Sequence, residues 1–319
     1  MLLFSLVIRL VSVGLMVLGA GVVAGQDYPN KPIRMLTAAA GSGSDFTARL
    51  VGQGISGPLG QPVIVDNRGN GFIAAEVVAR TPADGYTLTL QGGAFHIAPL
   101  LQSLPYSVAD LAPVSLLERT VLILAVHPSV PVKSVKDLIA LAKSKPGELN
   151  YATAITGGAG HLAGELLKSE AGVKITRIPY KSTTLGVASV MSGEAQLVFA
   201  DVGLVMPHVK SGKLRAVAVT SPQRSTLVPD LPTVAASGLP GFEMQTVSGI
   251  LAPVKTPAAI INRLSQEIAR LLSRAEVKEK FANAGLEPVG STPEQYAATI
   301  KSDMVKIGKL IKDAGIKAD

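Results

Sequence analysis

Two glycine-rich segments carry residue types that suit binding of a small anion. Residues 38–45 lie between an apolar run and a helical pattern, and residues 156–160 stand directly before His161. Glycine lets a backbone approach a ligand closely, and a helix N-terminus offers unpaired N–H groups and a partial positive charge. Neither segment is followed by Gly-Lys-Ser/Thr, so a P-loop for nucleotides is excluded. The alternative interpretation of each segment is a tight turn with a capped helix.

Catalytic and metal chemistry find less support in the sequence. Ser42, Ser44, His161 and Asp201 are residue types of a hydrolytic triad, but no Gly-X-Ser-X-Gly surrounds a candidate nucleophile. The histidines lack ligand spacing and the chain has no cysteine, which argues against metal sites, thiol catalysis and disulfides. We therefore expect a binding protein, not an enzyme, with no metal and no cofactor.

Three polar residues each keep two interpretations. His161 begins a predicted helix, where it either caps and packs or contacts a ligand. Asp201 ends a predicted strand, where it either caps the next helix or contacts a ligand. Lys181 is interpreted as a residue of a lobe surface or a hinge.

The elements that position these residues follow a repeated strand–helix pattern. Strands are predicted at residues 33–39, 62–65 and 86–91, alternating with helices at 44–56, 73–80 and 95–102. After a proline-containing segment, 104–113, the pattern restarts with strands at 121–126, 149–152, 174–178, 195–200 and 214–220 and helices at 135–144, 161–170, 184–191 and 204–210. Such alternation is typical of parallel sheets with helices on both faces.

The last part of the chain is different. Residues 221–248 are rich in proline and glycine, residues 248–251 form a short predicted strand, and helices are predicted at 257–272 and 292–314. This helical tail is expected to pack on the first α/β unit. The prediction is an α/β, two-lobed periplasmic-binding-protein fold in which each lobe is a mostly parallel sheet flanked by helices. Domain 1 is residues 26–125 plus 249–319, and domain 2 is residues 126–248, joined by a hinge that closes on ligand.

The N-terminus predicts export. Residues 1–25 contain one charge, Arg9, and a continuous apolar run at 10–23 followed by small residues. This pattern is typical of a signal peptide cleaved near residue 25, and an uncleaved anchor is the alternative. We expect a periplasmic protein.

The charge balance is basic but diffuse. The chain carries 30 Lys and Arg against 23 Asp and Glu, a net charge of +7. The lysines are spread along predicted helix faces, without a dense basic run or interleaved aromatic residues, and the chain has no tryptophan. Nucleic acid is therefore not expected as a partner, whereas positive charge mildly favours an anionic solute.

Several motifs, in order along residues 28–316, resemble one receptor family. They include Tyr-Pro-Asn-Lys-Pro-Ile at 28–33, Leu-Gly-Gln-Pro-Val at 59–63, Asp-Gly-Tyr-Thr-Leu at 84–88, Pro-Gly-Glu-Leu-Asn-Tyr-Ala at 146–152 and Pro-Asp-Leu-Pro-Thr-Val at 229–234. The chain resembles the extracytoplasmic solute receptors of the tripartite tricarboxylate transporters, the Bug receptors. The resemblance implies a two-lobed receptor that clamps a small carboxylate and delivers it to membrane permease subunits. A sensing module that signals to a membrane partner is the alternative, and a monomer is expected.

The resemblance also implies where the ligand lies. The first loop would hold a carboxylate largely through backbone groups, and the second lobe would contribute residues 153–161 and the surroundings of Asp201. The expected ligand-binding residues are Ala40, Gly41, Ser42, Gly43, Ser44, Asp45, Phe95, His96, Thr153, Thr156, Gly157, Gly158, His161 and Asp201. Compared with the family pattern, Val247 occupies a position often held by tryptophan.

Overall fold

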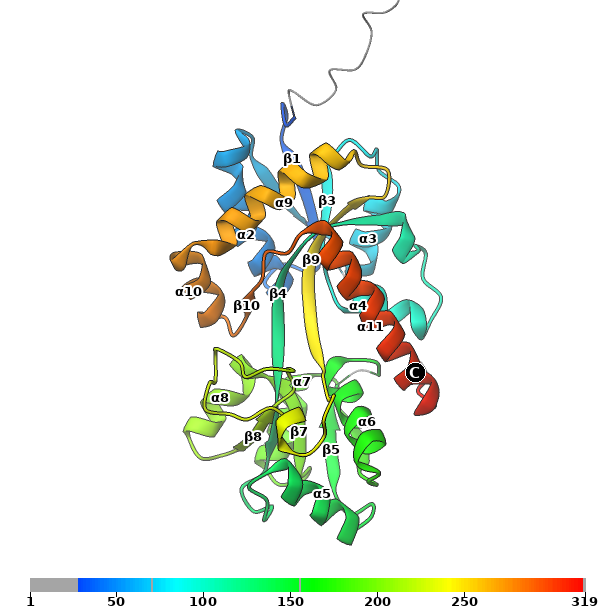
Figure 1. Cartoon of the computed structure of the whole chain (residues 1–319), viewed down its shortest axis with the longest axis vertical. Coiled ribbons are helices and arrows are strands. Elements are labelled where there is room, and N and C mark those ends of the chain that lie inside the picture. The colour runs from blue at the N-terminus through cyan, green and yellow to red at the C-terminus, as the bar shows by residue number, and fades with distance from the viewer. Residues whose placement is uncertain (1–27, 70, 155, 318–319) are drawn as a thin grey trace, which may run out of the picture.

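The computed structural model describes residues 28–317 except 70 and 155. Its main sheet runs in the order β2-β1-β3-β9-β4-β7-β5-β6, and β8 and β10 pair with β4 beside this path. Figure 1 shows two lobes, one above the other, with β4 and β9 running between them. The predicted signal peptide lies outside the described residues. Within the described part of the chain, every helix is too short or too polar to cross a membrane.

The first lobe is built on three parallel strands. β1 (Ile33–Thr37) lies between β2 (Val63–Asn67) and β3 (Thr87–Gly92), and it pairs in parallel with both. α2 (Gly43–Leu59) and α3 (Gly71–Ala79) connect these strands, because parallel neighbours need a crossover connection. The apolar residues of β1 and α2 share one core with those of α9 (Ala258–Ser273). This lobe confirms the strand–helix alternation predicted from the sequence.

The second lobe repeats the arrangement. β5 (Asn150–Thr153) lies between β6 (Thr176–Pro179) and β7 (Leu197–Asp201), all parallel. The helices around them are α5 (Val135–Ser144), α6 (Ala159–Ala171), α7 (Thr183–Met191) and α8 (Val202–Lys210). β8 (Arg215–Val219) pairs with β4. The carboxyl ends of β5 and β7 face the first lobe, as Figure 1 shows.

The strand β4 (Leu111–Val126) belongs to both lobes. Its first part pairs antiparallel with β9 (Gln245–Pro253) as far as Val121, and its second part, from Leu122, pairs with β7 and β8. Each lobe therefore has a mixed sheet, in which three parallel strands are joined to antiparallel crossing strands. The sequence predicted only residues 121–126 as strand, after the proline-containing segment 104–113, so the first part of β4 was missed. The strand accommodates Pro113 at a shift of register between Pro113 and Ser115, the kind of irregularity at which a sheet tolerates proline.

Short elements complete the first lobe. α4 (Ala94–Ile97) and two 3₁₀ turns, η1 (Ala98–Leu100) and η2 (Val108–Asp110), link β3 to β4. α10 (Ala275–Asn283) and β10 (Glu287–Pro288) follow α9, and neither was predicted. A third 3₁₀ turn, η3 (Ala235–Ser237), lies in the proline-rich segment of the second lobe.

The final helix, α11 (Pro293–Asp313), packs against both lobes. It begins with a capping box between Thr292 and Gln295, which satisfies two helix-terminal donors. Tyr296 and Ile300 are buried in the first lobe, whereas the apolar residues near its end, Ile307, Leu310 and Ile311, join the core of the second lobe with α6. The tail was expected to pack on the first lobe, and the structure adds this contact with the second (Figure 1).

Candidate functional site

A pocket lies at the edge of the second lobe that faces the first lobe. It has a volume of about 270 Å³ and is lined by the carboxyl ends of β5 and β7, the first turn of α6, Thr183 of α7, and Leu122 and Thr246 of the crossing strands. Ligands of open α/β sheets bind at this edge, because successive strand–helix loops converge there. The pocket therefore combines backbone groups of several loops with residues of the hinge strands.

The second glycine-rich loop forms one wall of the pocket. Gly158 is the N-cap of α6 and Gly157 has a φ of +77°, a left-handed conformation that glycine adopts without strain. At Gly160 a Cβ atom would lie 2.6 Å from the carbonyl oxygen of Phe199, so only glycine lets α6 start this close to β7. The first-turn N–H groups of α6 thus stand at the carboxyl end of the sheet.

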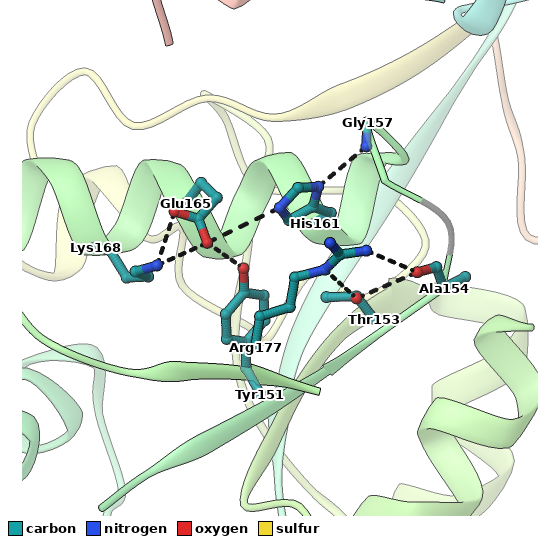
Figure 2. A network of polar contacts seen from close by, with 8 residues as sticks. All are labelled: Tyr151, Thr153, Ala154, Gly157, His161, Glu165, Lys168 and Arg177. Carbon is teal, nitrogen blue, oxygen red and sulfur yellow. Dashed lines mark hydrogen bonds and ion pairs between the residues drawn. The ribbon is translucent and has the colours of Figure 1, made fainter. Parts of the chain in front are cut away.

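His161 supports this loop from behind. Its Nδ1 accepts a hydrogen bond from the N–H of Gly157 at 3.0 Å, so that nitrogen carries no proton. Nε2 lies 3.9 Å from Oε1 of Glu165, on the next turn of α6 (Figure 2). His161 lines the pocket and also fixes the loop, which fits the capping or packing interpretation made from the sequence. A ligand contact for His161 stays a prediction.

The network continues into the core of the lobe. The Tyr151 hydroxyl donates to Glu165 at 2.5 Å, and Lys168 donates to both oxygens of the same carboxylate at 2.8 Å (Figure 2). Burial, together with the neighbouring Glu165, raises the pKa of Tyr151, so the phenol stays a donor. Glu165 consequently holds α6 against β5 and orients His161.

Arg177 fixes the other end of the loop. Its Nε donates to the Thr153 hydroxyl at 2.9 Å and its Nη2 donates to the carbonyl of Ala154 at 3.2 Å (Figure 2). The sequence analysis did not single out Arg177, Glu165 or Tyr151. Their neighbours in the chain gave no signal, since an arginine in a strand and a tyrosine in a core are common. Lys181, weighed in the sequence analysis, is exposed.

Asp201 stands at the mouth of the pocket. It ends β7 and precedes α8, but its side chain makes no capping hydrogen bond. Its side chain is exposed, yet enough protein lies around the carboxyl to remove part of its solvent. This partial loss of solvent raises the pKa of the Asp201 carboxyl. Asp201 therefore occupies the N-cap position of α8 without a capping side-chain hydrogen bond, and the ligand contact stays a prediction.

The first glycine-rich loop is held by Asp45. The carboxylate of Asp45 is buried and accepts from the Gly41 N–H, the Asn67 amide and the Arg49 guanidinium, each at 2.9 Å. The hydrogen bond from Arg49, followed by that from Gly41, lowers the pKa of Asp45 to about 2. Both carboxylate oxygens of Asp45 accept hydrogen bonds from the protein, so Asp45 fixes the conformation of the loop.

The other residues of this loop form its open surface. Ser42 is the N-cap of α2 and accepts from the Asp45 N–H at 3.2 Å. Ala40, Gly41 and Gly43 are exposed, and Ser44 is half-buried. A Cβ atom at Gly41 or Gly43 would meet no described atom within 4 Å, so a ligand can reach this backbone.

Phe95 and His96 lie inside the first lobe. Phe95 stacks on Tyr106 with ring centroids 5.4 Å apart, and His96 Nε2 lies 3.2 Å from Oδ2 of Asp303 on α11. Among the described residues, Nδ1 of His96 is buried without a hydrogen-bond partner. The structure gives both side chains packing or pairing roles, and a direct ligand contact for them stays a prediction.

The structure brings Thr153, Gly158, His161 and Asp201 together around one pocket. Thr156 lies behind the loop, in a neighbouring polar cavity that also contains Arg177. Ala154, Thr183 and Thr246 line the pocket and were not predicted. Thr183 begins α7 shortly after the end of β6, and Asp201 is the last residue of β7, so the rule of convergent strand ends could have found Thr183. Among residues 28–317, with 70 and 155 left out, no three His, Cys, Asp or Glu side chains gather as a metal site would require.

A buried acid lies on β4 near the hinge. Glu118 is 3% exposed, accepts a hydrogen bond from Thr47 at 2.8 Å and also bonds Ser248 of β9. Burial raises the pKa of Glu118 to about 7, although both hydroxyl hydrogen bonds act in the opposite direction. Glu118 links the first turns of α2 to both crossing strands.

Two α/β lobes, two crossing strands and a pocket at convergent loops define a solute-binding protein of the two-lobed periplasmic type. A family model described as "Tripartite tricarboxylate transporter family receptor" matches residues 47–316, and the chain belongs to this family. The family is one of substrate-binding receptors, not of enzymes, as the sequence predicted.

Individual relatives cover nearly the whole chain. Protein BugT of Bordetella pertussis is 34% identical over 315 residues, which cover 96% of this chain and 97% of BugT. The structure titled "R. palustris Rpa4515 with adipate" is 33% identical, with a TM-score of 0.76, and covers 92% of this chain and 100% of its own. MatC from Rhodopseudomonas palustris with bound malate is 25% identical, with a TM-score of 0.70, and covers 89% of this chain and 100% of its own.

Proposed function

We propose that this protein is an exported, periplasmic receptor that binds a small organic carboxylate between its lobes. It delivers the carboxylate to the membrane subunits of a tripartite tricarboxylate-type transporter. The observation that carries the proposal is the pocket at the carboxyl ends of β5 and β7, and in the first lobe the exposed residues Ala40, Gly41 and Gly43 offer a second backbone loop. Two similar proteins hold adipate and malate, both carboxylates, in their solved structures.

The proposed site binds the anion mainly through backbone N–H groups. The first turn of α6 supplies unpaired donors and the positive end of a helix dipole, and the first residues of α2, Gly43 and Ser44, supply the same from the first lobe. Thr153, Thr183 and Thr246 provide hydroxyls on the pocket wall. Hydrogen bonds to a charged acceptor are about twice as strong as those between neutral groups, so a carboxylate is favoured over its ester.

Closure follows from the crossing strands. The sheet partners of β4 change between Val121 and Leu122, and β9 begins at Gln245, so few backbone positions separate the lobes. Rotation at these positions brings the loop at residues 40–43 toward the pocket, where both loops contact one ligand. The hinge lies near the predicted boundaries at 125/126 and 248/249, which stay predictions.

Thermal unfolding of ligand-stripped protein tests the carboxylate. Mono-, di- and tricarboxylates are each compared with the corresponding methyl ester. A ligand at about 100 times its dissociation constant adds roughly 2.7 kcal/mol to the free energy of unfolding, and that shifts the melting temperature by several degrees. The proposal fails if esters stabilise as strongly as acids, or if only sugars or cations act.

A further inference from the structure

The two crossing strands have a second face, opposite the ligand pocket. Successive side chains of a strand point to opposite sides, and Thr246 and Leu122 line the pocket described above. Arg119 pairs in register with Val247, and Val121 with Gln245. Arg119, Gln245 and Val247 line a larger cavity of about 600 Å³. The paired crossing strands β4 and β9, here called the hinge ribbon, therefore separate two cavities that share no described residue.

Both lobes build this second cavity. Its walls are α6, the segment at residues 241–245 and α11, which Figure 1 shows descending beside β9 toward α6. Its apolar lining is contributed by Leu166, Met244, Val247, Ile307 and Leu310. The volume lies within the range of small-molecule sites, about 300–1,000 Å³, in which an apolar surface and a few charged groups combine.

Most charged side chains around the cavity are paired within the protein. Lys306 donates to Glu243 at 2.7 Å, Lys309 is paired with Asp313, and Asp303 lies 3.2 Å from His96. Two charges remain. Among the residues that the structure describes, neither the Arg119 guanidinium nor the Glu170 carboxylate has a hydrogen-bond or ion-pair partner.

These two unpaired charges have opposite signs and come from different walls. Arg119 is half-buried on β4 and Glu170 is on the last turns of α6. Partial burial raises the pKa of the Glu170 carboxyl, which indicates that surrounding protein already removes part of its solvent. A charge that loses solvent without gaining a partner costs free energy, and an external ligand with complementary charges would remove that cost.

We propose that this cavity is a second binding site, for a small zwitterion with an apolar body. The carboxylate of the ligand pairs with Arg119, its ammonium group pairs with Glu170, and its hydrocarbon part covers the apolar lining. A guanidinium binds a carboxylate through two parallel hydrogen bonds, which gives this end of the site its direction. The site is independent of the carboxylate proposed for the pocket on the other face of the hinge ribbon.

Titration calorimetry on the full mature protein tests this site with three probes of one chain length. They are 6-aminohexanoate, hexanoate and hexylamine. The titrations use the Asp201→Phe variant, in which a bulky side chain blocks the mouth of the first pocket without removing a side-chain hydrogen bond. The zwitterion is expected to bind at least about tenfold more tightly than either singly charged probe, because each of these leaves either the half-buried Arg119 or the exposed Glu170 without a partner.

Substitutions then locate the binding. Arg119→Met and Glu170→Gln should each weaken 6-aminohexanoate binding by about tenfold or more. Ser302→Trp on α11 fills the cavity from an exposed lining position and should abolish binding. Lys301→Trp, at the neighbouring exposed residue outside the lining, is the matched control and should bind normally. Circular dichroism melting checks that each variant is folded.

Three results would overturn the proposal. One is equal affinity, or no affinity, for all three probes in the Asp201→Phe protein. Another is tight binding of hexanoate that Glu170→Gln leaves unchanged, which would make the cavity an anion site. The third is binding that survives Ser302→Trp, which would place the ligand elsewhere. None of these outcomes bears on the methyl-ester comparison for the first pocket, so the two proposals fail separately.

Discussion

Gly157 and Leu101 meet across the two lobes: a Cβ atom built on Gly157 would lie 2.3 Å from Cδ1 of Leu101. Gly157 belongs to the loop before α6, and Leu101 follows η1 in the first lobe and packs against the core of the second. The loop that offers N–H groups to the ligand is therefore braced by a first-lobe side chain. The conformation of this loop depends on the relative position of the lobes.

The first prediction concerns this contact. Gly157→Ala should destabilise the protein by about 1–2 kcal/mol from the left-handed backbone alone, and displacement of Leu101 adds to that. Adding Leu101→Ala removes the clash, so urea unfolding should show the double variant to be more stable than the sum of the two single changes. Strict additivity would mean that the two residues do not touch in solution.

The second prediction concerns the buried acid Glu118. Its pKa is about 7 in the folded protein, against an ordinary value of 4.5, so folding favours the protonated carboxyl. Its contribution to stability is therefore full below about pH 4.5 and is lost as pH rises through about 7. That difference corresponds to about 3 kcal/mol of unfolding free energy.

Glu118→Gln isolates this effect, because the amide stays neutral. Urea unfolding at pH 5 and at pH 8 should show a smaller fall in stability for the variant than for the unaltered protein. Thr47→Val serves as the companion variant. It removes a hydrogen bond that favours the ionised form, so the fall between the two pH values should become steeper. Identical pH slopes in all three proteins would contradict the assignment.

The third prediction concerns the first loop. Asp45→Ala leaves the Gly41 N–H and the Asn67 amide without their acceptor, so it should cost about 2 kcal/mol and weaken ligand binding. Because the pKa of Asp45 is lowered in the folded protein, its stabilising effect is present above its ordinary value of 3.8 and is lost as pH falls toward about 2. Acid titration monitored by circular dichroism measures this loss. Asp230→Ala, at an exposed aspartate outside the site, is the control.

The fourth prediction concerns ligand affinity and Asp201. An ionised Asp201 repels a carboxylate in the adjoining pocket, whereas a protonated one does not. Burial raises the pKa of Asp201, so affinity should fall as pH rises through that pKa. Calorimetry should show tighter binding and a flatter pH dependence for Asp201→Asn. If the variant binds more weakly at every pH, Asp201 instead accepts a hydrogen bond from the ligand.

The sequence predicted the fold where local pattern decides it. α5 occupies 135–144 as predicted, because Ser134 caps it and proline and glycine follow it. The residues of β4 before Val121 were missed, since a proline tolerated at a register shift depends on the partner strand β9. In the site, the loops at residues 38–45 and 156–160 could be located from the sequence because glycines follow a predicted strand in both. The supporting roles of Glu165 and Arg177 could not, because they arise from contacts between elements that the sequence leaves unplaced.

The position of α11 also has a consequence for the order in which the chain folds. Residues 122–244 supply most of the second-lobe core, but Ile307, Leu310 and Ile311 complete it. During synthesis the rest of this lobe emerges more than sixty residues before Ile307, the first of the α11 residues that complete its core. The apolar face of α6 therefore stays uncovered until α11 has been made. The second lobe reaches its final packing only after the first-lobe segments between residue 244 and α11 have been synthesised.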